Sequence, residues 1–521
     1  MISITDIRVS AVAAPPTGFG GDPRNIAQGG PVYANVYLQV FTSDPSLTGS
    51  SIIFTNGRGL QEQAQMTERI ARHFLLQTSI DVSQLHEGTK LGDLAQQMLQ
   101  DPDYAWLGAA GASRMAIGAV INALWDLMSR FLKLPAWRAL LTLAPEQLAA
   151  LIDFEPIADV LPPAEAVQML QQARQGMDAR IDDIHRHGLL AYNTAGWSGI
   201  DIDTLCQQVR DLISRNWSMV KVKVGAEFAK ARLAAAGRGE WLSRTQLDEL
   251  ASRAAEQDCE RLSAVFDTIS QNDQRLKQMT LAVDSNQIFD VQSAIVFIHK
   301  LAKRLYRVNP SYQIQWFEEP TSAQSAMGHV QIEQALTMSF SDFEPPLQAP
   351  ISTGEQGASP SVFKDLLFAQ LGRFDHEKTY ALPVLQMDYC RVAGIADNLA
   401  ILLLAQKARQ QGRNVRICPH AGGIGLCEGV RHVQAIKQAL FGANDNRGTA
   451  DILEFVEEPS RSVHEGVFNN PALISNGYYQ MNHEPGVGVD YADAGLELYQ
   501  LPNGQAWQTK SLQPLARQIS P

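Results

Sequence analysis

The chain has 521 residues, of which 45% are hydrophobic and 19% are charged. A chain of this length and composition can bury a large core and divide into more than one structural unit, which excludes a disordered or fibrous protein. Its 43 Lys and Arg residues against 55 Asp and Glu residues give a net charge of −12. No basic surplus is left to neutralise phosphates, so we expect no nucleic-acid partner.

The cysteines and the first residues indicate a cellular location. Five scattered cysteines without a Cys-x-x-Cys pair favour a reducing compartment over a disulfide framework. The amino terminus alternates like a strand and lacks the basic start and apolar run of a signal peptide. The longest apolar stretches, residues 116–124 and 399–405, are too short to span a bilayer. We therefore expect a soluble, cytoplasmic protein with no membrane partner.

Residues 1–150 are predicted to form an α+β domain. Three β-rich runs come first, at residues 2–12, 32–41 and 50–55, and a Gly- and Pro-rich loop separates the first two. The hydrophobic period then becomes helical over residues 60–141. This order is typical of a small meander followed by helices.

Residues 187–458 show short apolar runs separated by longer helical segments, a pattern typical of repeated βα units with parallel strands. Eight such runs predict a closed (β/α)₈ barrel of the TIM type, in the α/β class. An open, doubly wound sheet is the alternative, but no Gly-rich nucleotide loop follows the first run. The candidate strands are residues 189–193, 219–224, 281–284, 314–318, 349–353, 384–388, 415–419 and 452–456.

Two segments depart from this repeat. Residues 226–280 are about twice as long as one βα connection requires, and Ser243 with Gln246 forms a capping-box pattern that predicts an extra helix. We expect this insertion to pack on the outside of the barrel, with a subunit contact or an active-site cover as alternatives. Residues 459–521, which are rich in Gly, Asn and Pro, are expected to return to the first domain.

Polar side chains end successive strands of the predicted barrel, which is where barrel enzymes carry their catalytic groups. From the second member onward they recur about one βα unit apart, so we expect them to converge on one mouth. The series consists of Lys223, Asp284, Glu318, Glu355, Asp388, His420 and Glu454.

Three consecutive members of this series, Asp284, Glu318 and Glu355, are carboxylates. Three acids in register on neighbouring strands would repel one another without a cation. An oxygen-only ligand set suits Mg²⁺ better than zinc. A solvated carboxylate is the alternative for each residue alone, but the set together predicts a Mg²⁺ site.

Basic groups accompany the predicted metal site. Lys221 and Lys223 are two residues apart, so a strand points both into the barrel, where a lysine beside another cation can act as a general base. A lysine-guarded edge strand is the alternative, although a closed barrel has no free edge. Asp388, one strand before His420, can bond one ring nitrogen and orient the other for proton transfer.

Several strings together resemble the enolase superfamily, in its mandelate racemase branch, and within that branch the dehydratases of acid sugars. The resemblance implies a barrel whose α+β cap is formed by the N-terminal region and completed by the C-terminal tail, with residues 18–31 closing over the substrate. The strings include Lys221-Val-Lys-Val-Gly225, Val283-Asp-Ser-Asn-Gln287, Glu318-Glu-Pro-Thr-Ser322, Ser352-Thr-Gly-Glu355 and Pro419-His-Ala-Gly-Gly423.

The resemblance also implies a role for each candidate residue. The superfamily uses a Lys or His base with Mg²⁺. The implied roles are metal ligand for Asp284, Glu318 and Glu355, base for Lys223, neighbouring cation for Lys221, general acid for His420 with Asp388, and substrate contact for Glu454, Trp197 and Asn286.

The implied reaction is the Mg²⁺-dependent dehydration of an acid sugar, with L-fuconate as the favoured substrate. Lys223 removes the C2 proton, the metal stabilises the enediolate, and His420 assists loss of the C3 hydroxyl to leave a 2-keto-3-deoxy acid. A racemase or epimerase of a 2-hydroxy acid and a non-catalytic scaffold are the alternatives. Superfamily members are commonly multimeric, so we expect a homo-oligomer. Gln356 and Tyr389-Cys390 depart from the family pattern and bear on the identity of the sugar.

Overall fold

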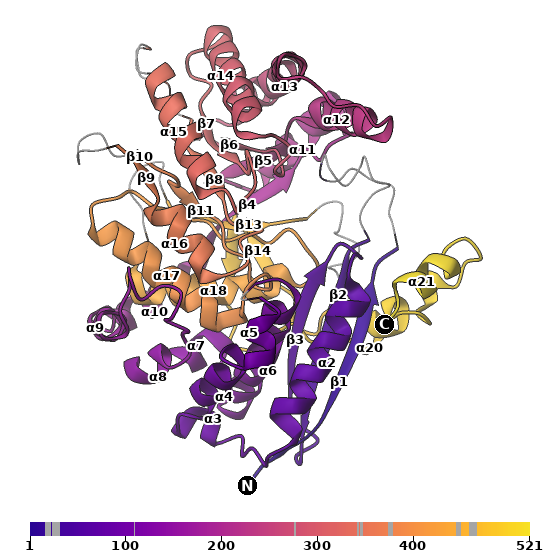
Figure 1. The fold of residues 1–521 in the computed structure, drawn as a ribbon, viewed down its shortest axis with the longest axis vertical. Helices are drawn as coiled ribbons and strands as arrows, with labels where there is room; N and C mark the ends of the chain where they lie inside the picture. Colours follow the sequence, from indigo (N-terminus) through magenta and orange to yellow (C-terminus); the bar gives the residue numbers. More distant parts are fainter. Residues whose placement is uncertain are drawn as a thin grey trace.

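Figure 1 shows two regions, a lower one built on the indigo sheet and an upper one of short strands surrounded by magenta to orange helices. The predicted α/β class is confirmed. The computed structural model describes residues 1–15, 22, 32–108, 110–275, 278–340, 343, 347, 349–372, 379–443, 450–457 and 466–521.

The lower region is an antiparallel meander with helices on it. Its strands pair in the order β1 (Ile4–Ala13), β2 (Ala34–Thr42) and β3 (Thr48–Thr55). The helices α2 (Leu60–Leu76) and α6 (Ala112–Phe131) pack against this sheet. Nearly every residue of α6 is buried, because α6 lies between the sheet and the barrel helix α17.

Part of the C-terminal segment lies against the same sheet (Figure 1). The N–H group of Leu501 donates to the Ala11 carbonyl at 2.9 Å, and Trp507 Nε1 donates to the Ala13 carbonyl at 2.7 Å. Residues near the C-terminus therefore bond to the end of strand β1. The elements of this segment are β14 (Leu473–Ser475), β15 (Tyr478–Gln480), α20 (Asp493–Tyr499), the 3₁₀ helix η2 (Gln505–Trp507) and α21 (Gln513–Ile519).

The upper region contains a strand at each of the eight predicted positions, and all eight run parallel. They pair in the order β12-β11-β8-β7-β6-β5-β4, with β13 on the other side of β4. The antiparallel strand β15 joins the start of β4 and makes the sheet mixed. The eight strands are β4 (Leu189–Ala195), β5 (Met219–Lys223), β6 (Thr280–Asp284), β7 (Ile314–Glu318), β8 (Ile351–Thr353), β11 (Val384–Leu385), β12 (Arg416–Ile417) and β13 (Leu453–Phe455).

Closure of the predicted barrel is incomplete. Within the described ranges, no ladder joins β12 to β13. A backbone hydrogen bond from Glu454 N–H to the Pro419 carbonyl, at 3.3 Å, spans this seam.

Helices cover the outside of these strands. The segment 226–280 supplies two of them, and the longer one, α13, packs against α11 and α14. The predicted capping box is present, because Ser243 and Gln246 exchange hydrogen bonds at the start of α13. The covering helices are α11 (Ile202–Ser214), α12 (Ala226–Gly237), α13 (Arg244–Asn272), α14 (Val291–Val308), α15 (Ala326–Phe340), α16 (Pro360–Phe368), α17 (Gly394–Gln410) and α18 (Leu426–Phe441).

Shorter elements connect the two regions or lie at the edge of the barrel. They are α3 (Gln84–Glu87), α4 (Lys90–Leu99), α5 (Pro102–Trp106), α7 (Ala136–Leu141), α8 (Pro145–Ala149), α9 (Pro163–Ala173), α10 (Met177–His187), β9 (Gln370–Leu371) and β10 (Thr379–Tyr380).

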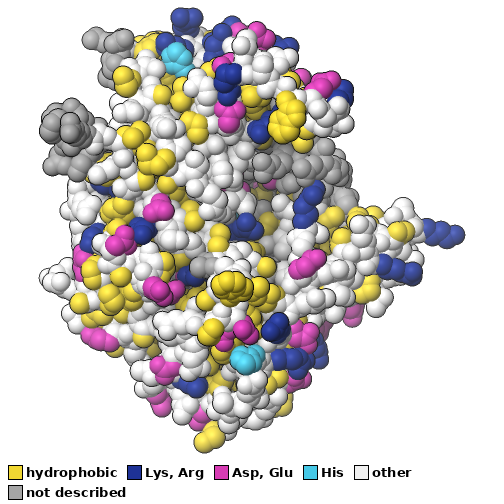
Figure 2. Space-filling view, in the orientation of Figure 1, with side chains coloured by type: hydrophobic (Ala, Val, Ile, Leu, Met, Phe, Trp, Pro, Cys, Tyr) yellow, Lys and Arg dark blue, Asp and Glu magenta, His cyan; other side chains and the backbone are white. Residues whose placement is uncertain are grey.

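The surface carries mixed charge. On the face shown in Figure 2, Lys and Arg side chains are interspersed with Asp and Glu side chains. A search of the described helices finds none with both the length and the apolar character that crossing a membrane requires. The five cysteines are all buried and unbridged.

A buried ion pair joins the lower region to the barrel. Arg114 on α6 donates from Nε and Nη2 to the two carboxylate oxygens of Asp397 on α17, each at 2.7 Å, and both side chains are buried. At the same crossing, a Cβ atom on Gly118 would lie 2.5 Å from the backbone nitrogen of Gly394. Close backbone packing and a bidentate ion pair therefore fix the two regions against each other.

Replacing Arg114 with Met should lower the free energy of unfolding by about 3–5 kcal/mol, because Asp397 would be left buried and unpaired. Denaturant titration followed by circular dichroism measures this. Arg58→Met at an exposed position is the matched control and should change the value by less than about 0.5 kcal/mol. Adding Asp397→Leu to Arg114→Met should restore part of the stability, and a strictly additive loss would contradict the coupling.

Candidate active site

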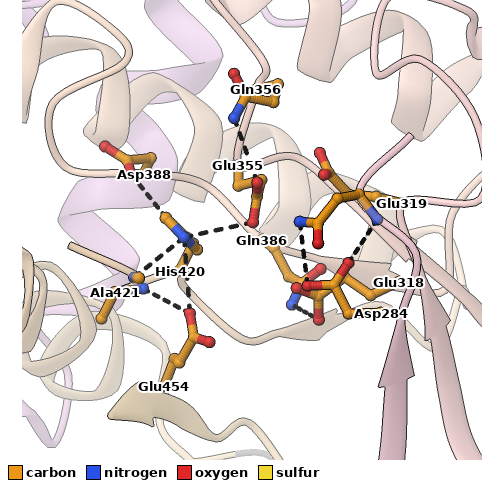
Figure 3. Close-up of polar contacts among 12 residues, drawn as sticks. Asp284, Glu318, Glu319, Glu355, Gln356, Gln386, Asp388, His420, Ala421 and Glu454 are labelled. Carbon is orange, nitrogen blue, oxygen red and sulfur yellow. Dashed lines mark hydrogen bonds and ion pairs between the residues drawn. The ribbon is translucent and has the colours of Figure 1, made fainter. Parts of the chain in front are cut away.

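The polar side chains predicted to converge lie together at the carboxyl ends of the barrel strands, and Figure 3 shows the acidic members with His420. Five of them, Lys223, Glu355, Asp388, His420 and Glu454, line a cavity that also contacts Trp197 and Asn286, the two further residues predicted to face a substrate. Tyr33, Phe54 and Asn56 line it from the lower region. The cavity therefore lies between the barrel mouth and the meander.

Three carboxylates form a compact set on adjacent parallel strands. One oxygen from each of Asp284, Glu318 and Glu355 lies within 4.8 Å of the others, and all three residues are buried. Asp284 and Glu318 are direct partners in the β6–β7 ladder, so strand pairing sets their spacing. The donors are all oxygen, which fits the preference of Mg²⁺. The predicted ligand set is therefore present.

Neighbouring donors hold Glu318 in place. Its Oε1 contacts Lys221 Nζ, and its Oε2 accepts hydrogen bonds from Gln386 Nε2 at 2.6 Å and Trp316 Nε1 at 2.9 Å. Ser352 Oγ donates to Gln386 Oε1 and so orients the amide. Burial raises the pKa of Glu318 to about 8, although the Lys221 charge opposes this. Sequence reasoning missed Gln386.

A signal for Gln386 does exist in the sequence. Gln386 precedes Asp388 by two residues, so an extended chain points both side chains to the same side. Glu319 was also missed. It is buried beside the triad with a backbone φ of 46°, and its Oε1 accepts a hydrogen bond from Gln287 Nε2 at 2.6 Å. Burial raises the pKa of Glu319 well above its usual range.

Lys223 lies between two carboxylates. Its Nζ is 2.6 Å from Asp284 Oδ2 and 2.8 Å from Asp22 Oδ1, and it lies 5.0 Å from the centre of the Trp197 ring. Burial lowers the pKa of Lys223 and Lys221 adds to this, but Asp22 and Asp284 outweigh both and raise the pKa well above its usual value. A neighbouring cation was predicted to lower the pKa of Lys223, and the two carboxylates outweigh that effect here.

The loop predicted to close over the substrate, residues 18–31, lies outside the described residues except for Asp22. Asp22 lines the cavity and contacts Lys223. Sequence reasoning placed the loop at the site but did not single out this residue.

Lys221 ties the carboxylates of different strands together. Its Nζ contacts Glu318, lies 2.9 Å from Glu454 Oε1, and lies 3.4 Å from Asp284 Oδ2. Burial would raise the pKa of Glu454, but the Lys221 and His420 charges lower it to about 2. The N–H group of Ala421 donates to Glu454 Oε2 at 2.8 Å. Glu454 is therefore held as a carboxylate by groups from several strands.

His420 and Asp388 form the predicted pair on neighbouring strands. The ring Nδ1 lies 2.7 Å from Asp388 Oδ2, and Nε2 lies 3.4 Å from Glu355 Oε2 (Figure 3). The N–H groups of Cys390 and Arg391 donate to Asp388 Oδ1 and fix this carboxylate. Burial opposes the imidazolium, but the carboxylates of Glu355, Asp388 and Glu454 outweigh burial and raise the pKa of His420 to about 10.

Comparison with known proteins agrees with this geometry. Residues 204–495 match the family model described as Enolase C-terminal domain-like, and the chain belongs to this enolase family. The mitochondrial enolase superfamily member 1 of Homo sapiens is 29% identical over 97% of this chain and 96% of its own length. Its crystal structure superposes with a TM-score of 0.77 at 28% identity, over 97% of this chain and 98% of that one.

Two further relatives are dehydratases by name. The L-galactonate dehydratase of Hypocrea jecorina is 29% identical over 98% of this chain and 96% of its own length. The L-talarate/galactarate dehydratase of Salmonella typhimurium LT2, liganded with Mg and L-lyxarohydroxamate, superposes with a TM-score of 0.61 at 19% identity, over 96% of this chain and 93% of that one. At that identity, the second likeness supports the fold alone.

Replacing Gln386 with Leu should weaken Mg²⁺ binding about 10- to 100-fold, because Glu318 would lose the donor that orients its Oε2. Isothermal titration calorimetry with Mg²⁺, or paramagnetic titration with Mn²⁺, measures this. Gln331→Leu, at an exposed position of α15, is the matched control. Unchanged metal affinity in Gln386→Leu would show that this amide does not hold Glu318 for the metal.

Proposed function

We propose that this protein is a Mg²⁺-dependent dehydratase of an acid sugar. The observation that carries the proposal is the placement of two proton-transfer groups on either side of the carboxylate triad. Lys223 contacts Asp284 at 2.6 Å, whereas His420 lies 3.4 Å from Glu355. Both line the cavity, so a sugar acid held between them would present C2 to one group and the C3 hydroxyl to the other.

Asp284, Glu318 and Glu355 would hold the metal. A bound divalent cation supplies positive charge that stabilises the negative charge developing on a carboxylate when its α-proton leaves. Lys221, which already bridges carboxylates of β6, β7 and β13, adds a fixed positive charge on the same side.

Lys223 is proposed to remove the C2 proton. Its contacts with Asp22 and Asp284 favour the ammonium form, so use of Asp284 as a metal ligand would lower the proton affinity of Lys223. The Trp197 ring, 5.0 Å away, and the burial of Lys223 restrict the path of the amine to the cavity.

His420 is proposed to protonate the leaving hydroxyl. The raised pKa keeps the ring protonated at neutral pH, and Asp388 fixes its orientation through Nδ1. The C2–H and C3–O bonds break, the hydroxyl leaves as water with the proton from His420, and the resulting enol tautomerises to a 2-keto-3-deoxy acid. Proton balance closes because Lys223 takes one proton and His420 gives one.

L-fuconate is the first substrate that we propose, with L-galactonate beside it because a relative of 29% identity carries that name. We further propose a closed (β/α)₈ barrel over residues 187–458, with residues 1–150 and 459–521 forming the cap. A homo-oligomer, a cytoplasmic location and the absence of nucleic-acid and membrane partners stay predictions.

Purified protein with Mg²⁺ should convert at least one member of a panel of acid sugars, including L-fuconate and L-galactonate, into a 2-keto acid. Semicarbazide trapping detects that product. Chelation should abolish the activity and Mg²⁺ should restore it, and Lys223→Ala should lower it by about 10²–10⁴-fold. Lys230→Ala, at an exposed position of α12, should behave as the unaltered protein. Activity that survives both chelation and Lys223→Ala would refute the proposal.

His420→Asn should lower 2-keto acid formation by about 10²–10⁴-fold while exchange of the substrate C2 proton with D₂O continues, because Lys223 still abstracts that proton. Proton NMR follows both events in one sample. His187→Asn, at an exposed position, is the matched control. Inversion at C2 by the unaltered protein, without any 2-keto acid, would instead establish the racemase or epimerase.

A further inference from the structure

The helix α13 reaches the barrel mouth through Arg261. The guanidinium Nη1 donates to the carbonyl of Lys223 at 2.6 Å, and Nη2 donates to the carbonyls of Gly196 at 2.7 Å and Trp197 at 3.1 Å. Gly196 and Trp197 directly follow β4, and Lys223 ends β5. One planar group from the segment predicted to be an insertion therefore holds the exits of two neighbouring barrel strands.

Asp258, one helical turn before Arg261, holds the other side of the same exit. Its Oδ2 accepts a hydrogen bond from the N–H group of Gly225 at 2.7 Å, and its side chain is buried. Spacing of three residues places the two side chains on one face of α13. Arg261 donates to the Lys223 carbonyl before the turn, and Asp258 accepts from the Gly225 N–H group after it.

The backbone at these exits needs such partners. Gly196 and Gly225 adopt the left-handed region, with φ of 60° and 78°, which turns the chain out of the strand direction. A Cβ atom on Gly225 would lie 2.4 Å from Ile288 Cδ1 and 3.1 Å from Phe289 Cζ, so little space is left beside this turn. Buried carbonyl and N–H groups without a partner are strongly unfavourable. Arg261 and Asp258 on α13 supply partners for the carbonyls of Lys223 and Trp197 and for the N–H group of Gly225.

These hydrogen bonds fix the backbone that carries Lys223 and Trp197. The Nζ of Lys223 lies 5.0 Å from the centre of the Trp197 ring, and Arg261 bonds to the backbone carbonyls of both residues. Gly196 adds a direct link, because its carbonyl also accepts from Lys223 N–H at 3.2 Å. Neither Asp258 nor Arg261 is among the described residues that line the cavity, so neither is placed to touch a substrate.

We propose that Asp258 and Arg261 are positioning residues that hold Lys223 and Trp197 at the geometry required for removal of the C2 proton. This inference rests on the proposed function for its catalytic consequence. The hydrogen bonds from Asp258 and Arg261 to the backbone, which we call the clamp, do not depend on the substrate. The segment 226–280 is therefore divided into a peripheral part, α12 with the loop before α13, and a part that serves the active site.

The test compares Arg261→Met and Asp258→Leu, which remove the clamp, with Arg261→Lys and Asp258→Asn, which keep a donor or an acceptor. Arg253→Met and Glu260→Gln, on the exposed side of α13, are the matched controls. In the folded, full-length protein, kcat should fall about 10- to 100-fold in the two clamp variants, since small misplacements of a catalytic group have effects of this size. The Mg²⁺ dissociation constant should stay within about 3-fold, because the triad on β6 to β8 is untouched.

Two further readouts separate positioning from general stability. The primary isotope effect with C2-deuterated substrate should rise in the clamp variants, because proton removal becomes slower relative to the other steps. Asp258→Asn should recover most of kcat, since its amide oxygen can still accept from Gly225 N–H. Loss confined to the yield or melting temperature of the folded protein, with kcat per folded site unchanged, would overturn the inference.

Hydrogen exchange tests the clamp without any substrate. Peptides covering residues 193–198 and 221–226 should lose protection in Arg261→Met and Asp258→Leu, whereas peptides covering β6 to β8 should not. If the unaltered protein dehydrates no sugar, the proposed function fails. This local loss of protection would still support the clamp. Protection that is unchanged, or lost evenly over the barrel, would overturn the clamp whatever the activity. If Arg261→Met does not fold, Arg261→Lys should show the same local loss at smaller amplitude.

Discussion

The site depends on the compensation of buried charge at the barrel mouth. Six carboxylates at the strand exits are almost wholly enclosed, and three basic groups, Lys221, Lys223 and His420, lie among them. A buried charge without a partner is highly unfavourable. A divalent cation would add positive charge where the carboxylates outnumber the basic groups. The same imbalance makes Lys221, which touches carboxylates from three strands, a structural requirement of the mouth.

Parallel strand pairing is what brings these charges together. Asp284 and Glu318 oppose each other in one ladder, and Asp388 and His420 form a bridge in the next sector. Each exit receives its side chain from a separate βα unit, so no short stretch of sequence contains the site. The lower region then closes the cavity from the other side. The Arg114–Asp397 pair and the backbone contact at Gly118 hold that region at the distance the cavity requires.

Much of this could be predicted from the sequence because it follows from period and spacing. Apolar runs about one βα unit apart predict parallel strands. Polar residues at the ends of these runs predict a site where the side chains converge. The late strands were overestimated, since β11 and β12 are only two residues long. Pro419, which cannot donate a ladder hydrogen bond, interrupts the pairing, and it resumes only at the isolated bridge between Asp388 and His420. Gln386 was missed because an uncharged amide carries no obvious chemistry until Glu318 is seen beside it.

The remaining site features could not be read from local pattern. Asp22, Asp258 and Arg261 act on Lys223 from a loop and from a helix face, and no periodic signal links such positions to a strand end. The pKa of Lys223 is an example. The neighbouring Lys221 alone predicts a lowered pKa, whereas Asp22 and Asp284 raise it. The direction of a pKa shift at a buried site depends on every charge around the group, and those charges come from distant parts of the chain.

The segment 226–280 shows how a long connection can coexist with a precisely placed Lys223. Its extra length lies between Gly225 and α13, where α12 and the following loop lie at the surface. Downstream of that length, Asp258 and Arg261 return to bond both sides of the turn that ends β5. A connection that is re-anchored at its origin can vary in the middle without moving Lys223. The catalytic geometry is therefore insulated from the part of the segment that looks most like an insertion.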